Sequence, residues 1–183
     1  SRSSDSISLL IVTPCSATKA KLVETNAAQQ EFWSKQSTPQ DNQLAQHGIA
    51  ARDLYQGAHH KSVMATVDKL RAKFCDAQIE IAIISAGYGL VKERDRLTPY
   101  DKTFDRMSPQ ESRQHSEHLS IRPQLNQQLS EFKFAIFLLS AKYLHAIEAP
   151  LGTAENEIYF AGSGFNSSQN NVYITRAGTT EAK

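Results

Sequence analysis

The sequence has few cysteines, no long apolar segment and almost no excess charge of either sign. Its two cysteines, Cys15 and Cys75, are too few for a disulfide framework in 183 residues, which fits a reducing compartment. No apolar run approaches the roughly 20 residues that cross a bilayer, and no signal-peptide pattern opens the sequence. We therefore expect a cytoplasmic protein that does not insert into a membrane.

The net charge is +1, from 20 Lys and Arg against 19 Asp and Glu. So small an excess creates no overall field that attracts nucleic acid or an anionic membrane, so any nucleic-acid site must be a local patch. The length suits one domain with a sizeable core. We expect a single domain over residues 1–183, with loose ends at residues 1–6 and 178–183.

Short apolar, β-branched runs recur along the sequence, and each predicts a strand buried in a parallel sheet. The runs are residues 7–13, 79–84 and 134–139, followed by shorter candidates at residues 157–160 and 172–175. Helical patterns lie between them, at residues 49–74 and 108–129. This alternation predicts an α/β fold, a three-layer sandwich with a mostly parallel central sheet.

Both helical segments have recognisable features. In the first, Val67 and Phe74 belong to an apolar series at helical spacing. In the second, Ser108 is a good cap, and Glu111 follows three residues later, which predicts a helix start. We expect that helix to run to about residue 119, with Pro123 interrupting the pattern before a further segment to residue 129.

Small hydroxyl residues follow three of the predicted strands. They are Ser16, Ser85 and Ser140. Parallel strands bring their carboxyl ends to one edge of a sheet, where ligands bind in open α/β folds. One such strand end would be weak evidence, but three together predict a crevice at this edge.

The stretch from Ser85 to Asp101 supplies further candidates. Gly87 and Gly89 let the backbone turn sharply and approach a ligand closely. The polar loop that follows ends in Tyr100 and Asp101. An ordinary connection from a strand to a helix explains these residues equally well.

The first predicted strand is followed by a loop of small and hydroxyl residues that ends in Lys19. Exposed backbone N–H groups beside hydroxyls and a lysine can hold a phosphate or a carboxylate. The loop lacks the glycines of a P-loop, so nucleoside triphosphate binding is not indicated. Cys15 would be a nucleophile if Lys19 or a helix N-terminus favoured its thiolate, and otherwise it is a small packing residue.

Four segments occur in a fixed order: Val12–Lys19, Ala51–Gly57, Ile84–Val91 and Pro99–Phe104. They correspond to a Cys-Ser/Gly-x-x-Lys loop, a Leu-Tyr-x-Gly turn, a Ser-Ala-x-x-Gly-Leu segment and a Pro-Tyr-Asp motif. In this combination the sequence resembles a bacterial and phage domain family that has no settled activity. The resemblance covers most of the chain, from the first predicted strand to the last loop before residue 166.

The same segments are similar, more distantly, to the YaaA-type peroxide-stress proteins, and the first loop resembles one in the archaeosine synthase accessory domain. These groups are related to the uracil-DNA glycosylases, so the resemblance implies a uracil-DNA-glycosylase-like fold. The glycosylase motifs themselves are absent, since Thr13-Pro14-Cys15-Ser16 stands where Gly-x-Asp-Pro would be. The resemblance therefore implies the superfamily rather than one reaction.

The first functional hypothesis is an enzyme that acts at an N-glycosidic bond or a modified base of DNA, RNA or a nucleotide. Such a reaction needs a carboxylate that steadies an oxocarbenium-like sugar or positions water, and donors for the departing base. Asp101 is the candidate carboxylate, and Lys19 is the candidate cation for a phosphate or leaving group. The candidate substrate-binding residues are Cys15, Ser16, Tyr55, Ser85, Gly87, Tyr88, Tyr100 and Ser140. For any single tyrosine, simple packing is the competing explanation.

The second hypothesis is a non-catalytic nucleic-acid-binding module, for example in stress or phage defence. Its candidate phosphate contacts are Lys92, Arg94, Arg96, Lys102 and Arg106. Carboxylates lie between them and nearly balance their charge, so a solvated loop with internal ion pairs explains the same pattern. These carboxylates are Glu93, Asp95, Asp101 and Asp105.

A third hypothesis is thiol chemistry at Cys15 with help from His59 or His60. We predict no cofactor and no metal site. Adjacent side chains on a helix, such as those of His59 and His60, point in different directions and rarely share an ion. His115 and His118, which follow each other at helical spacing, lack a neighbouring acidic or cysteine cluster, so we expect exposed histidines there. The sequence leaves the oligomeric state open.

Overall fold

The computed structural model describes residues 6–20 and 48–176. Apart from residue 6, the loose ends expected at residues 1–6 and 178–183 lie outside the described residues. In this part of the chain, no helix is long and apolar enough to span a bilayer.

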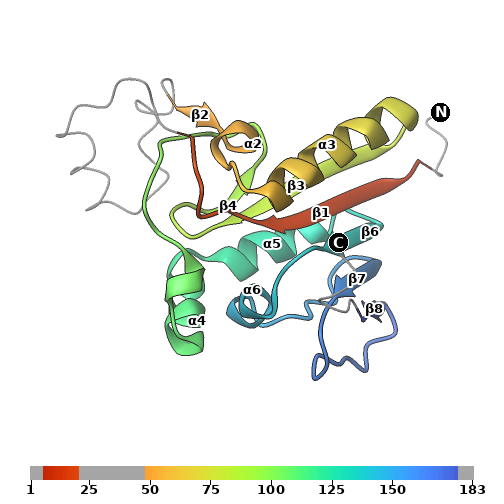
Figure 1. Cartoon of the computed structure of the whole chain (residues 1–183). Coiled ribbons are helices and arrows are strands. Elements are labelled where there is room, and N and C mark those ends of the chain that lie inside the picture. Colours follow the sequence, from red (N-terminus) through yellow and green to blue (C-terminus); the bar gives the residue numbers. More distant parts are fainter. Residues whose placement is uncertain (1–5, 21–47, 177–183) are drawn as a thin grey trace.

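A six-stranded sheet forms the centre of the molecule, with the strand order β4-β3-β1-β6-β7-β8 (Figure 1). Its strands are β1 (Ser8–Pro14), β3 (Gln78–Ser85), β4 (Gly89–Lys92), β6 (Phe134–Phe137), β7 (Asn156–Phe160) and β8 (Val172–Thr175). All neighbouring strands pair in parallel except β3 and β4, which are antiparallel. Two short strands, β2 (Ile49–Ala50) and β5 (Arg96–Leu97), form a separate antiparallel pair. The prediction of a mostly parallel sheet is confirmed.

The apolar runs form strands here because the sheet buries them on both faces. In β1, the consecutive residues Leu10, Ile11 and Val12 are all buried, and so are Ile83 and Ile84 in β3. Successive side chains of a strand point to opposite faces, so burial of consecutive residues requires cover on both. A strand of this kind has no solvent face that could show an alternating pattern.

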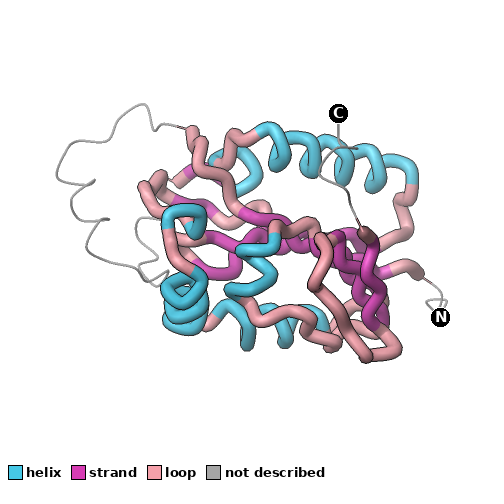
Figure 2. The backbone as a smooth tube through the Cα atoms, turned by 60° about the horizontal axis from the view of Figure 1, so that its bottom comes forward, coloured by secondary structure: helices cyan, strands magenta, loops and turns pink. Residues whose placement is uncertain are grey.

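Helices cover both faces of the sheet, as Figure 2 shows. Helix α3 (Ala58–Lys73) lies on one side, and α4 (Pro109–His118), α5 (Ile121–Leu129) and α6 (Ala141–Ala146) lie on the other. A short helix α2 (Ala51–Leu54) precedes α3, and a 3-10 turn η2 (Phe104–Arg106) precedes α4. The architecture is therefore an α/β sandwich of three layers, as predicted.

The helices confirm one local prediction and correct two. At the start of α4, Ser108 Oγ accepts the Glu111 N–H at 3.2 Å, and the Glu111 carboxylate accepts the Ser108 N–H at 2.7 Å, so the predicted capping pair forms. The break between α4 and α5 falls at Ser120, whose φ is 53°, and not at Pro123 as predicted. Pro123 lies in the first turn of α5, where a missing N–H removes no helical hydrogen bond. Phe74 follows the last residue of α3 and is 44% exposed instead of buried.

The glycine turn after β3 closes a β-hairpin. Ser85 pairs with Gly89, and the three residues between them form the turn into β4. Gly89 has a φ of 82°, a left-handed conformation that glycine adopts without steric cost. The competing explanation of this stretch, a connection from a strand to a helix, is therefore wrong.

A buried carboxylate fixes the loop before β7. Glu157 is fully buried and accepts the backbone N–H groups of Gly152, Thr153 and Ala154 at 2.7–3.0 Å. It also accepts the hydroxyl of Tyr159 at 2.8 Å. These four donors replace the water that the carboxylate loses on burial, so the group is satisfied within the protein.

Candidate functional site

The strand order reverses at one point of the parallel sheet. Counted along the chain, the five parallel strands β1, β3, β6, β7 and β8 lie in the order 2-1-3-4-5, so the reversal falls between β1 and β6. In open α/β sheets, ligands bind beyond the carboxyl ends of the strands at such a point. The loop after β1 and the start of α6, which follows β6, therefore frame the candidate site.

The loop after β1 is fastened to the segment that connects α2 to α3. The Gln56 N–H donates to the Thr18 carbonyl oxygen at 2.9 Å, and the Gly57 N–H donates to Ser16 Oγ at 3.1 Å. A Cβ atom at Gly57 would lie only 2.8 Å from the Ser16 Cβ, so only glycine lets these segments approach so closely. The predicted Cys-Ser loop and the Leu-Tyr-x-Gly turn therefore form one structural unit.

Three hydroxyl groups meet next to this unit. Tyr55 OH donates to Ser85 Oγ at 3.0 Å, and Tyr100 OH lies 2.9 Å from Tyr55 OH and 2.7 Å from Ser85 Oγ. Burial raises the pKa of Tyr55 and of Tyr100 far above the ordinary value, so both hydroxyls stay protonated. Tyr55 and Ser85 are fully buried, whereas Tyr100 is half-buried. Tyr100 therefore lies nearest the surface, and the other two residues support it from the core.

The ring of Tyr100 packs against the glycine turn. A Cβ atom at Gly87 would lie 2.7 Å from Cδ2 and Cε2 of this ring, which is closer than real carbon contacts allow. Tyr88 meets the same ring edge to face, with 5.4 Å between the ring centroids, and its hydroxyl donates to the Thr98 carbonyl oxygen at 3.1 Å. The packing of Tyr100 thus explains why position 87 holds glycine.

Lys19 is a half-buried cation beside these rings. Its Nζ lies 4.3 Å from the centroid of the Tyr100 ring and 6.0 Å from that of Tyr55, within the range of cation–π interactions. Among the described residues, no carboxylate forms a salt bridge with it. Burial lowers the pKa of Lys19, and the interactions with Cys15 and Asp101 partly oppose this shift. A desolvated amine without a close counter-ion attracts an anionic ligand.

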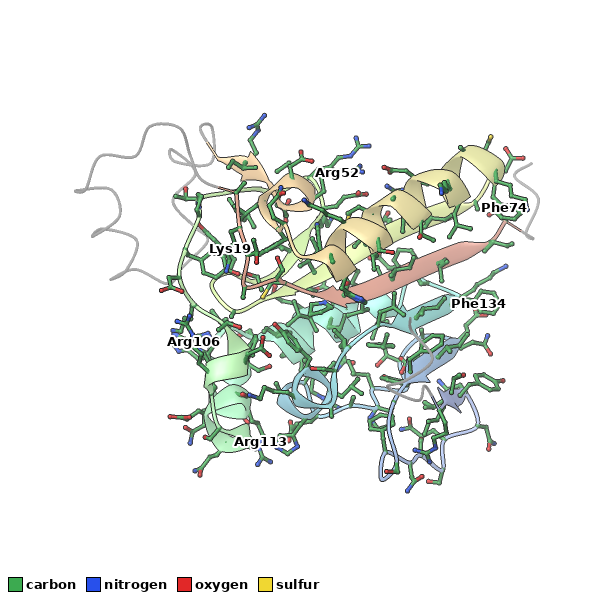
Figure 3. The ribbon with its side chains drawn as sticks, in the orientation of Figure 1. Lys19, Arg52, Phe74, Arg106, Arg113 and Phe134 are labelled. Atoms are coloured by element: carbon green, nitrogen blue, oxygen red, sulfur yellow. The ribbon has the colours of Figure 1, made fainter. Side chains whose placement is uncertain are left out.

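Asp101, the predicted catalytic carboxylate, lies at the surface. Its side chain is 89% exposed and pairs with Arg106 at 3.5 Å. Figure 3 shows Lys19 and Arg106 at the same end of the molecule, beyond the carboxyl end of β1. Asp101 raises and Arg106 lowers the pKa of Lys19, so the three charges influence one another at the rim of the site.

Cys15 and Tyr143 connect β1 to α6 across the point where the strand order reverses. Cys15 Sγ lies 3.4 Å from Tyr143 OH, and both side chains are buried. Burial, and to a lesser extent the neighbouring thiol, raises the pKa of Tyr143. Ser140, by contrast, is exposed and forms the cap position of α6. The serines at the three strand ends therefore occupy neighbouring strands but differ in burial.

His115 has a role at the site that the sequence did not indicate. It was expected to be exposed, but its ring is half-buried and its Nε2 lies 2.6 Å from the Ala86 carbonyl oxygen. Because a carbonyl oxygen can only accept, Nε2 carries the proton. Burial lowers the pKa of His115, which favours the neutral ring. The bond joins α4 to the glycine turn over 29 residues of sequence, so no local pattern could have identified it.

The basic residues of the alternative hypothesis are less well balanced than the sequence suggested. Glu93 is 7% exposed and accepts from Arg52 at 3.4 Å and from Arg71 at 2.5 Å. It therefore does not offset the surface cations. The exposed cations are Lys92, Arg94, Arg96, Lys102 and Arg106, and the exposed carboxylates beside them are Asp95, Asp101 and Asp105.

The histidines predicted as possible helpers of Cys15 lie in the first turn of α3. His60 is almost fully buried, and its Nε2 bonds to the Arg52 carbonyl oxygen at 2.9 Å. Burial lowers its pKa, so the neutral ring is favoured. Over residues 6–20 and 48–176, no group of three or more His, Cys, Asp or Glu side chains could hold a metal ion.

A comparison with protein families gives one match. The model of a family of unknown function, DUF6884, matches residues 40–175. This range includes Tyr55, Ser85, Tyr100 and Asp101, but not the loop that carries Lys19. No curated protein and no solved structure matches the chain.

Proposed function

The chain belongs to the DUF6884 family, and we propose that it is an enzyme that acts on a nucleic acid or a nucleotide, at an N-glycosidic bond or a modified base. The reacting group would bind beyond the carboxyl ends of β1, β3 and β6. We also propose that the fold is uracil-DNA-glycosylase-like. The three-layer α/β sandwich and the mostly parallel sheet are compatible with that relationship.

The observation that carries this proposal is the environment of Lys19. Its amine is half-buried, lies over an aromatic ring, and lacks a salt bridge to a carboxylate of the described residues. Holding a charged amine away from water costs free energy, which binding of a phosphate would offset. Lys19 also belongs to the loop after β1, a strand that borders the point where the strand order reverses and where α/β folds bind their ligands.

The proposed roles follow from charge and position. Lys19 would bind a substrate phosphate or stabilise negative charge on a departing base. Asp101, at the rim, would face the sugar and either steady its positive charge or orient water. Arg106, which pairs with Asp101, would exchange that partner for a second phosphate oxygen. Tyr55 and Ser85 would hold Tyr100 in place through their hydrogen bonds to its hydroxyl.

Binding tests the first step of this proposal. We would measure thermal shifts with nucleobases, nucleosides, nucleotides and short oligonucleotides, modified bases included. A ligand that binds only the native state stabilises it by about 2.7 kcal/mol at a hundredfold excess over Kd. Lys19→Met should weaken binding of a phosphate-bearing ligand about tenfold or more. The matched control is Lys69→Met, because Lys69 is exposed on α3. Equal affinities in the two variants would contradict the assigned role of Lys19.

The surface charge favours one other candidate, a nucleic-acid-binding module without catalysis. Glu93 is buried and paired with two arginines. The exposed cations around β4, β5 and η2 therefore outnumber the exposed carboxylates. Phosphate contacts of this kind weaken steeply as salt rises. Binding of oligonucleotides only, lost at high salt and retained in Lys19→Met, would favour this candidate over the enzyme.

A further inference from the structure

The position of Lys19 changes what Tyr100 can do. The sequence predicts Tyr100 as a stacking surface for a base. In the structure, the Lys19 amine lies 4.3 Å from the ring centroid and therefore occupies one face of the ring. A base that stacked on this face would have to displace the amine and forfeit its attraction to the ring.

We propose that Tyr100 is a positioning residue, whose ring holds the Lys19 ammonium in place to receive a phosphate group of the ligand. This inference rests on the proposed function and names the ligand chemistry of the same site. It assigns the ring to the lysine and leaves base stacking to other residues. The phosphate belongs either to a free nucleotide or to a nucleic-acid backbone, which the choice of probe distinguishes.

The ring of Tyr100 is fixed well enough to serve as a platform. Its hydroxyl is bound to Tyr55 OH at 2.9 Å and to Ser85 Oγ at 2.7 Å, and both partners are fully buried. A face of the ring packs against Gly87, where even one extra carbon would collide, and the ring also contacts that of Tyr88. A group held by hydrogen bonds to two buried partners and by contacts with the turn keeps a defined orientation.

The charges and burial around Lys19 explain why its ammonium is stabilised by contact with the Tyr100 ring. Burial disfavours the ammonium, whereas the electron-rich face of a ring attracts it. The charged or titratable groups that act on Lys19 are Cys15, Tyr55, Tyr100, Asp101 and Arg106. Asp101 pairs with Arg106 and forms no salt bridge with Lys19. The ring, 4.3 Å from the amine, therefore favours the charged form together with Cys15 and Asp101.

NMR on the full chain with ¹³C-labelled lysine tests this arrangement without any ligand. Protons held over the face of an aromatic ring resonate upfield, so the Lys19 Hε signals should lie upfield of those of the other lysines. Loss of the signal in Lys19→Arg assigns it. Tyr100→Phe keeps the ring and should retain the upfield position, whereas Tyr100→Leu should lose it. Lys19 signals at ordinary positions in the wild-type protein would overturn the inference, whatever the variants do.

Titration of the same samples with inorganic phosphate and with a nucleoside monophosphate adds the second readout. Relative to wild type, Tyr100→Leu should weaken phosphate binding about five- to thirtyfold, and Tyr100→Phe should stay within about twofold. Equal affinities in Tyr100→Leu and wild type would overturn the positioning role. An upfield Lys19 signal that no phosphate compound shifts would contradict the proposed function but support the contact with the ring, so the two failures are distinguishable.

Discussion

Replacement of Gly87 by alanine tests how tightly the glycine turn supports Tyr100. The new Cβ atom would lie 2.7 Å from two ring carbons of Tyr100, whereas ordinary carbon contacts begin near 3.4 Å. The ring must therefore move by several tenths of an ångström, which strains its hydrogen bonds to Tyr55 and Ser85. Overpacking of this kind costs about 1–3 kcal/mol of unfolding free energy. Position 87 has no positive φ, so the cost comes from packing alone.

Urea unfolding followed by circular dichroism measures this cost. With a urea dependence of about 2 kcal/mol per molar, the midpoint should fall by about 0.5–1.5 M in Gly87→Ala. Gly162→Ala is the matched control, because nothing lies within 4 Å of its Cβ and its φ is not positive. That control should stay within about 0.5 kcal/mol of wild type or gain slightly. Equal midpoints for the two alanine variants would refute the packing argument.

Three further predictions concern single side chains. Tyr55→Phe removes the hydroxyl that bonds to Ser85 and Tyr100, and urea unfolding should show a loss of about 1–3 kcal/mol; no loss would mean that the hydroxyl cluster is not formed. Glu157→Gln replaces an acceptor of four hydrogen bonds with a group that has one acceptor oxygen, so it should cost about 2–4 kcal/mol, and a midpoint equal to wild type would contradict these hydrogen bonds. Lys19→Met should stabilise the fold at neutral pH, because the folded state lowers the pKa of Lys19 below 10.5 and so disfavours the ammonium. This gain should be largest below the lowered pKa and should vanish as the pH rises towards 10.5; unfolding curves at several pH values would expose the opposite trend.

The sheet was largely predictable because its signals are local. The runs around Val12, Ile83 and Phe137 are too apolar for any place but a sheet buried on both faces. The start of α4 was equally readable, since a capping box lies within four residues. The hairpin after β3 was not, because the same glycine turn can lead to a strand or to a helix, and β4 depends on its pairing with β3.

The sequence identified most of the residues of the candidate site, but it did not show which of them contact one another. The sequence marked Tyr55, Ser85 and Tyr100 separately, but their shared hydroxyl cluster joins positions 15 to 45 residues apart. It also suggested Tyr100 for stacking, because nothing local shows that Lys19 reaches its ring from 81 positions away. Such long-range contacts follow from the topology of the sheet, which brings separate loops to one edge.

Release of a free base is the readout closest to the proposed reaction. We would incubate the protein with nucleosides, nucleotides and oligonucleotides, modified bases included, and quantify the free base by chromatography. Asp76→Asn is the control for Asp101→Asn, because Asp76 is exposed in the turn before β3. We expect release by the wild-type protein and by Asp76→Asn, and its loss in Asp101→Asn and Lys19→Met. Release that persists unchanged in both site variants would contradict the assigned roles, and absence of release from every compound would contradict the proposed enzyme.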